Sequence, residues 1–137
     1  MEICPNLRFA FLEIDATWLH FWSDWGNRHV KDSPRVKSGH HLEPRWGEDP
    51  YLLPETLRDP TEYIQSGRFL SGYSEHEDLR YLIDNLGART FMYASDYPHG
   101  DTEWDRVHNT RALKTLSAAE KDILLGSNAA RSYKLST

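Results

Sequence analysis

The residues best suited to chemistry lie in one short segment, Ser95-Asp96-Tyr97-Pro98-His99, which follows an apolar run over residues 90–94. A carboxylate at such a position can bind a metal ion or act as a general base, and an imidazole three positions later can reach a substrate or a metal-bound water. The apolar run predicts a strand, so we expect the Asp96 carboxylate to be partly buried at the strand end. Burying an ionised carboxylate is costly unless a cation or hydrogen-bond donors compensate. Asp96 is therefore the first candidate for a functional residue.

Each candidate also has a purely structural interpretation. Asp96 can cap the following turn by accepting hydrogen bonds from backbone N–H groups, and spacing alone does not separate this role from metal binding. His99 can reach a substrate or a metal-bound water, although the pattern favours an exposed loop histidine. Glu13 ends a second apolar run and can be an active-site carboxylate or simply the last residue of a strand. For Glu13 we favour the active site.

Other polar residues give weaker signals. His40 and His41 are adjacent, but no third ligand stands at a spacing typical of a metal site. Asp101 and Glu103 fit a solvated loop. The histidine pair is therefore only a weak metal signal, and the two acidic residues point to no site.

The elements that must position Glu13 begin with the apolar run over residues 7–14, which predicts a strand covered on both faces. A helix to about Lys31 is expected next, because aromatic residues recur at spacings of four, three and four. We interpret this stripe as the packing face of the helix rather than as a platform for substrate. Its members are Trp18, Trp22, Trp25 and His29.

The second and third units are again predicted to be a strand followed by a helix. A short helical turn around residues 60–64 precedes a strand over 68–73, and Ser74 with Glu77 forms a capping box for a helix that ends at Gly87. The third strand covers residues 90–94. Helices are then expected over 107–116, from the capping box of Ser117 and Glu120 to Gly126, and from the cap Asn128 to the end.

Repeated strand-helix units predict an α/β domain with a parallel sheet of about three strands and flanking helices. The whole chain, residues 1–137, is expected to form this single domain, interrupted by a proline-rich, irregular loop over residues 32–60. In parallel folds the catalytic groups sit at the carboxyl ends of strands. Glu13, Asp96 and His99 are therefore expected at one edge of the sheet.

Composition limits the classes of function. The net charge of -5 argues against a nucleic-acid binder, and no apolar run is long enough to span a membrane. The start lacks the pattern of a signal peptide, and the single cysteine, Cys4, excludes a disulfide framework, so a cytoplasmic location is expected. No glycine-rich phosphate loop follows a predicted strand, which disfavours a nucleotide-binding domain.

The segment Tyr93–Asp101 resembles the last barrel strand of the amidohydrolase-related family, which comprises metal-dependent TIM-barrel hydrolases and decarboxylases. Other segments agree with the family and stand in its order. They are Leu7–Glu13 with Ala16–Leu19 (the sixth strand and its helix), Asp59–Ile64 (a Pro-Ser-Glu-Tyr loop with Thr61 in place of serine), Glu77–Gly87 and Asn128–Arg131.

The resemblance implies a divalent metal ion, zinc first, and a small carbonyl or carboxylate substrate. Asp96 matches the aspartate of strand eight, which is a metal ligand or a proton acceptor beside the metal. Glu13 stands at the end of strand six, where some relatives carry a histidine, and His99 lines the site. Whether the reaction is hydrolysis or decarboxylation stays open.

The resemblance also implies an incomplete enzyme. The family's His-x-His pair of strand one and the histidine of strand five have no counterpart here, and a (β/α)8 barrel takes about 250 residues. This chain matches the C-terminal part of such a barrel. An N-terminal half, or self-association through exposed sheet edges, is the expected partner. The alternative is a catalytically inactive remnant or interaction module that keeps the scaffold.

Overall fold

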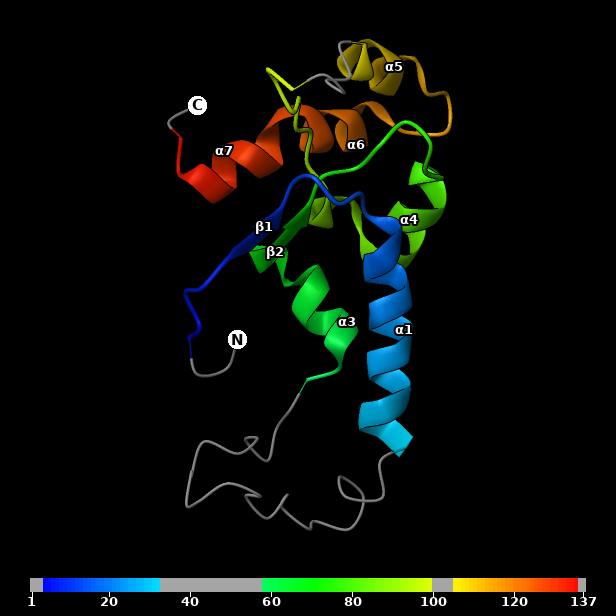
Figure 1. The fold of residues 1–137 in the computed structure, drawn as a ribbon, viewed down its shortest axis with the longest axis vertical. Helices are drawn as coiled ribbons and strands as arrows, with labels where there is room; N and C mark the ends of the chain where they lie inside the picture. Colours follow the sequence, from blue (N-terminus) through cyan, green and yellow to red (C-terminus); the bar gives the residue numbers. More distant parts are fainter. Residues whose placement is uncertain (1–3, 33–57, 100–104, 136–137) are drawn as a thin grey trace.

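The computed structural model describes residues 4–32, 58–99 and 105–135, and it combines a small parallel sheet with surrounding helices (Figure 1). In chain order the elements are β1 (Phe9–Phe11), α1 (Thr17–Asp32), α3 (Pro60–Tyr63), the π-helical turn η1 (Ile64–Arg68), β2 (Phe69–Ser71), α4 (Leu79–Leu86), the 3-10 turn η2 (Ala88–Thr90), α5 (Arg106–Ala112), α6 (Ala118–Asp122), the π-helical turn η3 (Ile123–Ser127) and α7 (Asn128–Tyr133).

The sheet holds two parallel strands and one isolated bridge. β1 and β2 pair with Phe9 opposite Phe69, and a single parallel bridge joins Ser71 to Phe91. The predicted third strand over residues 90–94 is therefore wrong in extent. The turn η2 occupies the residues just before Phe91, and the Tyr93 N–H donates to the Leu124 carbonyl at 2.9 Å. The backbone of this third segment is thus shared between β2 and η3.

β1 is packed on one face only. The rings of Phe9 and Phe11 lie against Phe69 at centroid distances of 5.4 and 5.3 Å. On the other face Ala10 is exposed, and beyond the strand Ile14 is 54% exposed. The predicted burial of this run on both faces is therefore wrong for the part of the chain that the structure describes.

The tryptophan stripe of α1 is not its main buried face. Leu19 and Ser23 are buried, whereas Trp22 and Trp25 are 43% and 46% exposed. The interpretation as a packing face is correct for Trp18, whose ring meets Phe11 edge-on at 5.3 Å, and in part for Trp22, whose ring stacks on Phe69 at 6.2 Å. The buried helix surface lies one position away from the stripe, where Ser23 and Gly26 let α1 approach α3 closely: a Cβ atom on Gly26 would lie 2.9 Å from the Pro60 side chain.

The helix α4 has the predicted buried face but a different start. Asp78, not Ser74, is the N-cap, and its carboxylate accepts the Tyr81 N–H at 3.0 Å. Gly87 ends the helix with φ 81, a backbone conformation that glycine adopts without strain. The buried residues are Leu79, Leu82, Ile83 and Leu86, which belong to the main hydrophobic core.

The C-terminal helices form one continuous run rather than two. The capping box of Ser117 and Glu120 is confirmed at the start of α6. Gly126 was expected to stop this helix, but the chain continues through η3 into α7. Asn128 was expected to cap the last helix. Instead its buried amide donates to the carbonyls of Ala88 and Phe91, at 2.9 and 2.6 Å.

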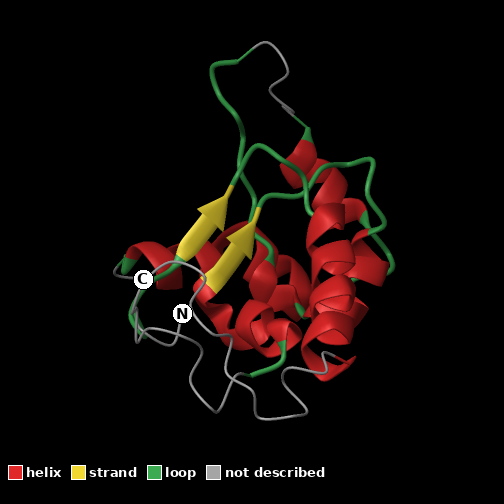
Figure 2. Cartoon of the chain, turned by 60° about the horizontal axis from the view of Figure 1, so that its bottom comes forward, coloured by secondary structure: helices red, strands yellow, loops and turns green. Residues whose placement is uncertain are grey.

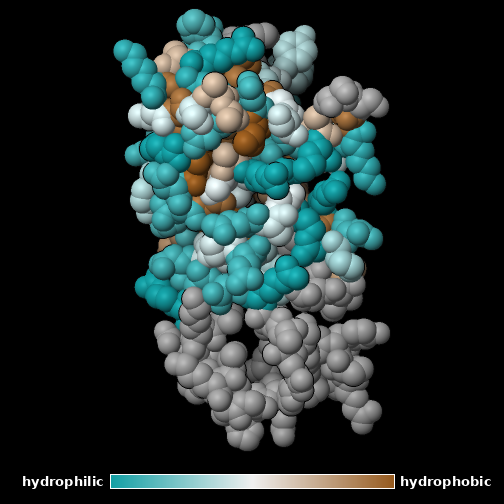
Figure 3. Space-filling model, turned by 180° about the vertical axis from the view of Figure 1, so that it is seen from behind, coloured by the Kyte–Doolittle hydropathy of each residue, from teal (hydrophilic) through white to brown (hydrophobic). Residues whose placement is uncertain are grey.

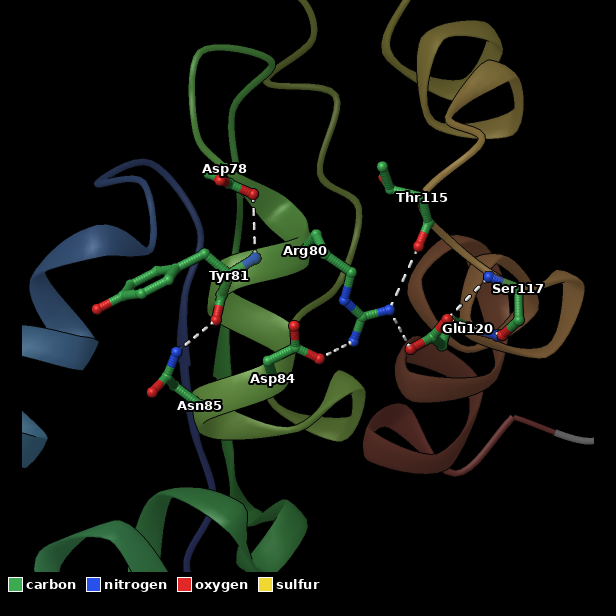
Figure 4. A network of polar contacts seen from close by, with 8 residues as sticks. All are labelled: Asp78, Arg80, Tyr81, Asp84, Asn85, Thr115, Ser117 and Glu120. Carbon is green, nitrogen blue, oxygen red and sulfur yellow. Dashed lines mark hydrogen bonds and ion pairs between the residues drawn. The ribbon is translucent and has the colours of Figure 1, made fainter.

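Arg80 joins α4 to this run (Figure 4). Its guanidinium contacts Asp84 one turn along α4 and Glu120 of α6, at 2.5 and 2.8 Å. Hydrogen bonds from Ser117 and Arg80 lower the pKa of the Glu120 carboxyl to about 2. α6 is therefore tied to the rest of the domain by a charged contact at its first turn.

None of the described helices is both long and apolar enough to cross a membrane. Large hydrophobic side chains are nevertheless exposed in several places, and Figure 3 shows hydrophobic residues visible between hydrophilic ones in the upper half of one face.

Candidate functional site

The corner after the third segment brings two candidate residues together. Asp96 has φ 55, a left-handed conformation that aspartate tolerates better than most residues. The His99 N–H donates to the Asp96 carbonyl at 2.9 Å, which closes a turn. The turn places the His99 Nδ1 atom 2.7 Å from the Asp96 Oδ1 atom. The Asp96 side chain is 20% exposed and the His99 side chain 61% exposed, so the histidine is the solvent-facing member of the pair.

Glu13 reaches the same place from another strand. One ligand atom of each of Glu13, Asp96 and His99 lies within 4.8 Å of those of the other two. The segment with Glu13 follows β1, whose arrowhead end marks the carboxyl edge of the sheet in Figure 2, and the segment with Asp96 follows the bridge residue Phe91, which pairs in parallel with Ser71 at the end of β2. The three residues singled out in the sequence are therefore neighbours, as the rule for parallel sheets predicts.

Glu77 holds the loop that carries Glu13. Its Oε1 atom accepts hydrogen bonds from the N–H groups of Ala16 and Thr17 at 2.8 and 2.6 Å, and from the Thr17 hydroxyl at 2.6 Å. Its Oε2 atom accepts the Ser74 N–H at 3.0 Å. One carboxylate thus fastens the start of α1 to the loop after β2. The sequence assigned Glu77 only to a local capping box, and nothing in the spacing indicated the contact across the fold.

A close backbone approach supports the same edge. The Gly72 N–H donates to the Phe11 carbonyl at 2.6 Å, and the Ser71 hydroxyl donates to the Asp15 carbonyl at 2.8 Å. A Cβ atom on Gly72 would lie 2.5 Å from the Leu12 carbonyl oxygen. Only glycine therefore lets the end of β1 come this close to β2.

Arg106 holds the backbone just before the Asp96 corner. It is almost fully buried and donates from Nη1 to the Ala94 carbonyl at 3.0 Å. Its guanidinium lies 5.9 Å from the centre of the Tyr73 ring, and the Tyr73 hydroxyl shares a 3.0 Å hydrogen bond with Thr110. Sequence reasoning missed Arg106, because a charge at the start of a predicted helix is usually solvated.

A cavity of about 180 Å³ lies beside this corner rather than at it. Its lining includes Ser74, Arg80 and Arg106 but none of the three candidate residues. The cavity therefore does not include the titratable side chains of the candidate site, Glu13, Asp96 and His99.

The chemistry of the donor set fits a divalent metal ion. Two carboxylates and an imidazole are ligands that zinc accepts, and catalytic zinc sites take three protein ligands and leave a fourth position open. The sequence had proposed Asp96 alone as a ligand, so the fold adds two donors to that expectation. The residues with weaker or no site signals, His40, His41, Asp101 and Glu103, lie outside the described residues.

Comparisons with known proteins identify a family and a similar fold. A family model described as amidohydrolase matches residues 4–135. The fold is similar to the crystal structure of an amidohydrolase from Mycobacterium avium subsp. paratuberculosis K-10, with a TM-score of 0.69 and 19% sequence identity. That similarity covers 93% of this chain and 28% of the other, so the chain spans well under a third of the length of that protein. A search of curated proteins found no match.

Proposed function

The chain belongs to the amidohydrolase family, and from this premise we propose that it forms part of a metal-dependent hydrolase or decarboxylase acting on a small carbonyl or carboxylate substrate. Family and fold support a hydrolase-like function in general, and amidohydrolases generally depend on a metal ion. The observation that carries the proposal is the approach of Glu13, Asp96 and His99 within 4.8 Å at the carboxyl edge of the sheet.

In this proposal Glu13, Asp96 and His99 hold the metal ion, and zinc is the first candidate. A bound divalent ion would supply an activated water or a polarised substrate carbonyl. Asp96 would also be the group that takes up a proton, at a carboxylate that is only 20% exposed and is held by the His99 imidazole. His99 orients that carboxylate through the 2.7 Å contact. Glu77 and Arg106 position the two loops without touching the reacting atoms.

The proposed partner is a polypeptide that supplies the preceding barrel units. The chain spans 28% of the length of the similar amidohydrolase. Within the described residues β1 pairs on one side only, and exposed apolar side chains, including Leu12 and Ile14, lie at its end. Such an edge is a template for another strand. A partner that carries the His-x-His strand would cover it and add metal ligands.

Metal analysis combined with an activity assay tests the proposal. The chain is titrated with Zn²⁺ by calorimetry, alone and after co-expression with a candidate N-terminal half. We expect one metal ion per chain in the complex and hydrolytic or decarboxylating turnover there. Asp96→Asn should abolish both, whereas Asp122→Asn, at an exposed aspartate of α6, should change neither. Unchanged metal content and turnover in Asp96→Asn would refute the assignment.

The alternative is a non-catalytic remnant or interaction module. The observation that favours it is the short span of the chain relative to the similar amidohydrolase. This alternative predicts partner binding without turnover, and binding that Asp96→Asn leaves intact. The same experiment therefore separates the two functions.

A further inference from the structure

Arginines gather at the amino edge of the sheet, opposite the candidate metal site. Arg8 directly precedes β1 and Arg68 directly precedes β2, and the register that pairs Phe9 with Phe69 makes the two arginines lateral neighbours. Arg89 belongs to η2, two residues before the bridge residue of the third segment. Each strand or bridge thus begins with an arginine on the same side of the molecule.

Arg131 of α7 lies over this edge. Its Nη2 atom donates to the Arg89 carbonyl at 3.3 Å and lies 3.4 Å from the position that a Cβ atom on Gly67 would take. Arg8 approaches from the other side, where its Nη1 atom donates to the Ser132 carbonyl at 3.4 Å. α7 is seen beside the strands in Figure 1. We call Arg8, Arg89 and Arg131 the amino-edge arginine cluster, with Arg68 at its flank.

The cluster has no acidic partner among the described residues. The ion pairs seen among the described residues involve Arg28, Arg80 and His99. The guanidinium groups of Arg8 and Arg131 instead donate to backbone carbonyls. Burial and the neighbouring charges of Arg89 and Arg8 lower the pKa of the Arg131 guanidinium, which means that the positive charge of Arg131 is repelled by those of the other two arginines. This concentration of like charge stands in a chain whose net charge is -5.

We propose that the amino-edge arginine cluster binds a small oxyanion of the phosphate class, either free phosphate or a phosphate monoester. A guanidinium carries five N–H donors in a fixed fork, and Arg8 and Arg131 each donate one to a backbone carbonyl. Donors therefore remain for an anion that approaches from solvent. Guanidinium groups match phosphate in a bidentate manner, and a dianion offsets the repulsion among three cations better than a single carboxylate does.

The experiment is a titration of the full chain with sodium phosphate, followed by amide NMR and by thermal unfolding, against sodium chloride at matched ionic strength. Phosphate should raise Tm by several degrees more than chloride and should shift the amides around Gly67, Arg89 and Arg131. Phenyl phosphate forms a second arm: binding of the ester as well as free phosphate indicates a monoester site, and binding of phosphate alone indicates free phosphate. Both results support the site.

Matched variants make the test specific. Arg131→Gln and Arg89→Gln should each weaken phosphate binding by roughly tenfold or more, since each removes a charge-assisted contact. Arg111→Gln, at an exposed arginine of α5, should leave it unchanged. Arg89 is exposed, so Arg89→Gln keeps the test valid if Arg131→Gln does not fold. Equal effects of phosphate and chloride, or full binding in both cluster variants, would overturn the proposal.

Discussion

The two edges of the sheet carry opposite chemistry and are built in opposite ways. At the carboxyl edge, acidic groups meet backbone N–H donors and an imidazole, as Glu77 and Asp96 do. At the amino edge, guanidinium groups meet backbone carbonyls, as Arg8 and Arg131 do. At the carboxyl edge Glu77 and Asp96 have hydrogen-bond partners within the described chain, whereas the amino edge leaves like charges side by side. We infer that the first edge is preorganised and that the second awaits a counter-charge.

The largest effect is expected from breaking the carboxyl edge at Gly72. In Gly72→Ala the new Cβ atom would meet the Leu12 carbonyl oxygen at 2.5 Å, and a backbone atom cannot move aside cheaply. We expect a loss of roughly 3 kcal/mol in the free energy of unfolding, measured by urea denaturation. Gly126→Ala is the control, because nothing lies within 4 Å of its Cβ position. Equal stability of the two variants would show that the close approach is unnecessary.

A smaller loss is expected when the carboxylate that joins the two loops is removed. Glu77→Ala leaves the N–H groups of Ala16, Thr17 and Ser74 without their acceptor, and we expect a loss of about 2 kcal/mol. Asp78→Ala removes a single helix cap beside it and should cost about 1 kcal/mol.

Zinc titration of the same two variants sharpens the comparison of the edges. Zn²⁺ affinity should fall in Glu77→Ala, since the Glu13 loop is released, and should persist in Asp78→Ala. An equal change in Zn²⁺ affinity in both variants would show that Glu77 only stabilises the fold and does not position Glu13.

Asn128→Ala tests the side of the third segment that faces the helices. The buried amide donates to the carbonyls of Ala88 and Phe91, and Phe91 is the residue that bridges to β2. We expect a loss of about 1.5 kcal/mol in chemical denaturation, because the Phe91 carbonyl loses its donor in the core, whereas the Ala88 carbonyl keeps the Phe91 N–H. The NMR signals of Glu13 should stay in place. Their displacement would mean that the edges are not independently built.

The smallest effect concerns Glu120, which belongs to neither edge. Its pKa of about 2 lies below its usual value of 4.5, so the carboxylate stabilises the fold above about pH 4.5 and this stabilisation is lost as the pH falls toward 2. Glu120→Gln should therefore flatten the dependence of Tm on pH between 5 and 2. Parallel curves for wild type and variant, measured by calorimetry, would contradict the pairing with Ser117 and Arg80.

Sequence reasoning reached the carboxyl edge because its signals are local. A short apolar run, a polar corner and the rule for parallel strands were enough to bring Glu13, Asp96 and His99 together. The capping box at Ser117 and the end of α4 at Gly87 also follow from local rules and were confirmed. Local backbone preference therefore decides these elements almost alone.

Long-range contacts explain what the sequence could not predict. Glu77 and Asn128 have the spacing of helix caps, but their side chains bond to segments distant in the sequence. The third strand is shortened because η3 competes for its backbone. The amino-edge arginine cluster draws on residues from both ends of the chain, so only the folded structure assembles it.

The contacts of Glu77 have a consequence for local unfolding of the two loops. The Glu77 carboxylate accepts hydrogen bonds from backbone N–H groups of two strand-helix units. If either loop opened alone, the carboxylate would therefore lose part of its hydrogen bonds. Residues 13–17 and 74–78 should then open as one cooperative unit. Hydrogen exchange would report a single opening free energy for the amides of Ala16, Thr17 and Ser74, so the edge that carries the candidate site would be released all at once or not at all.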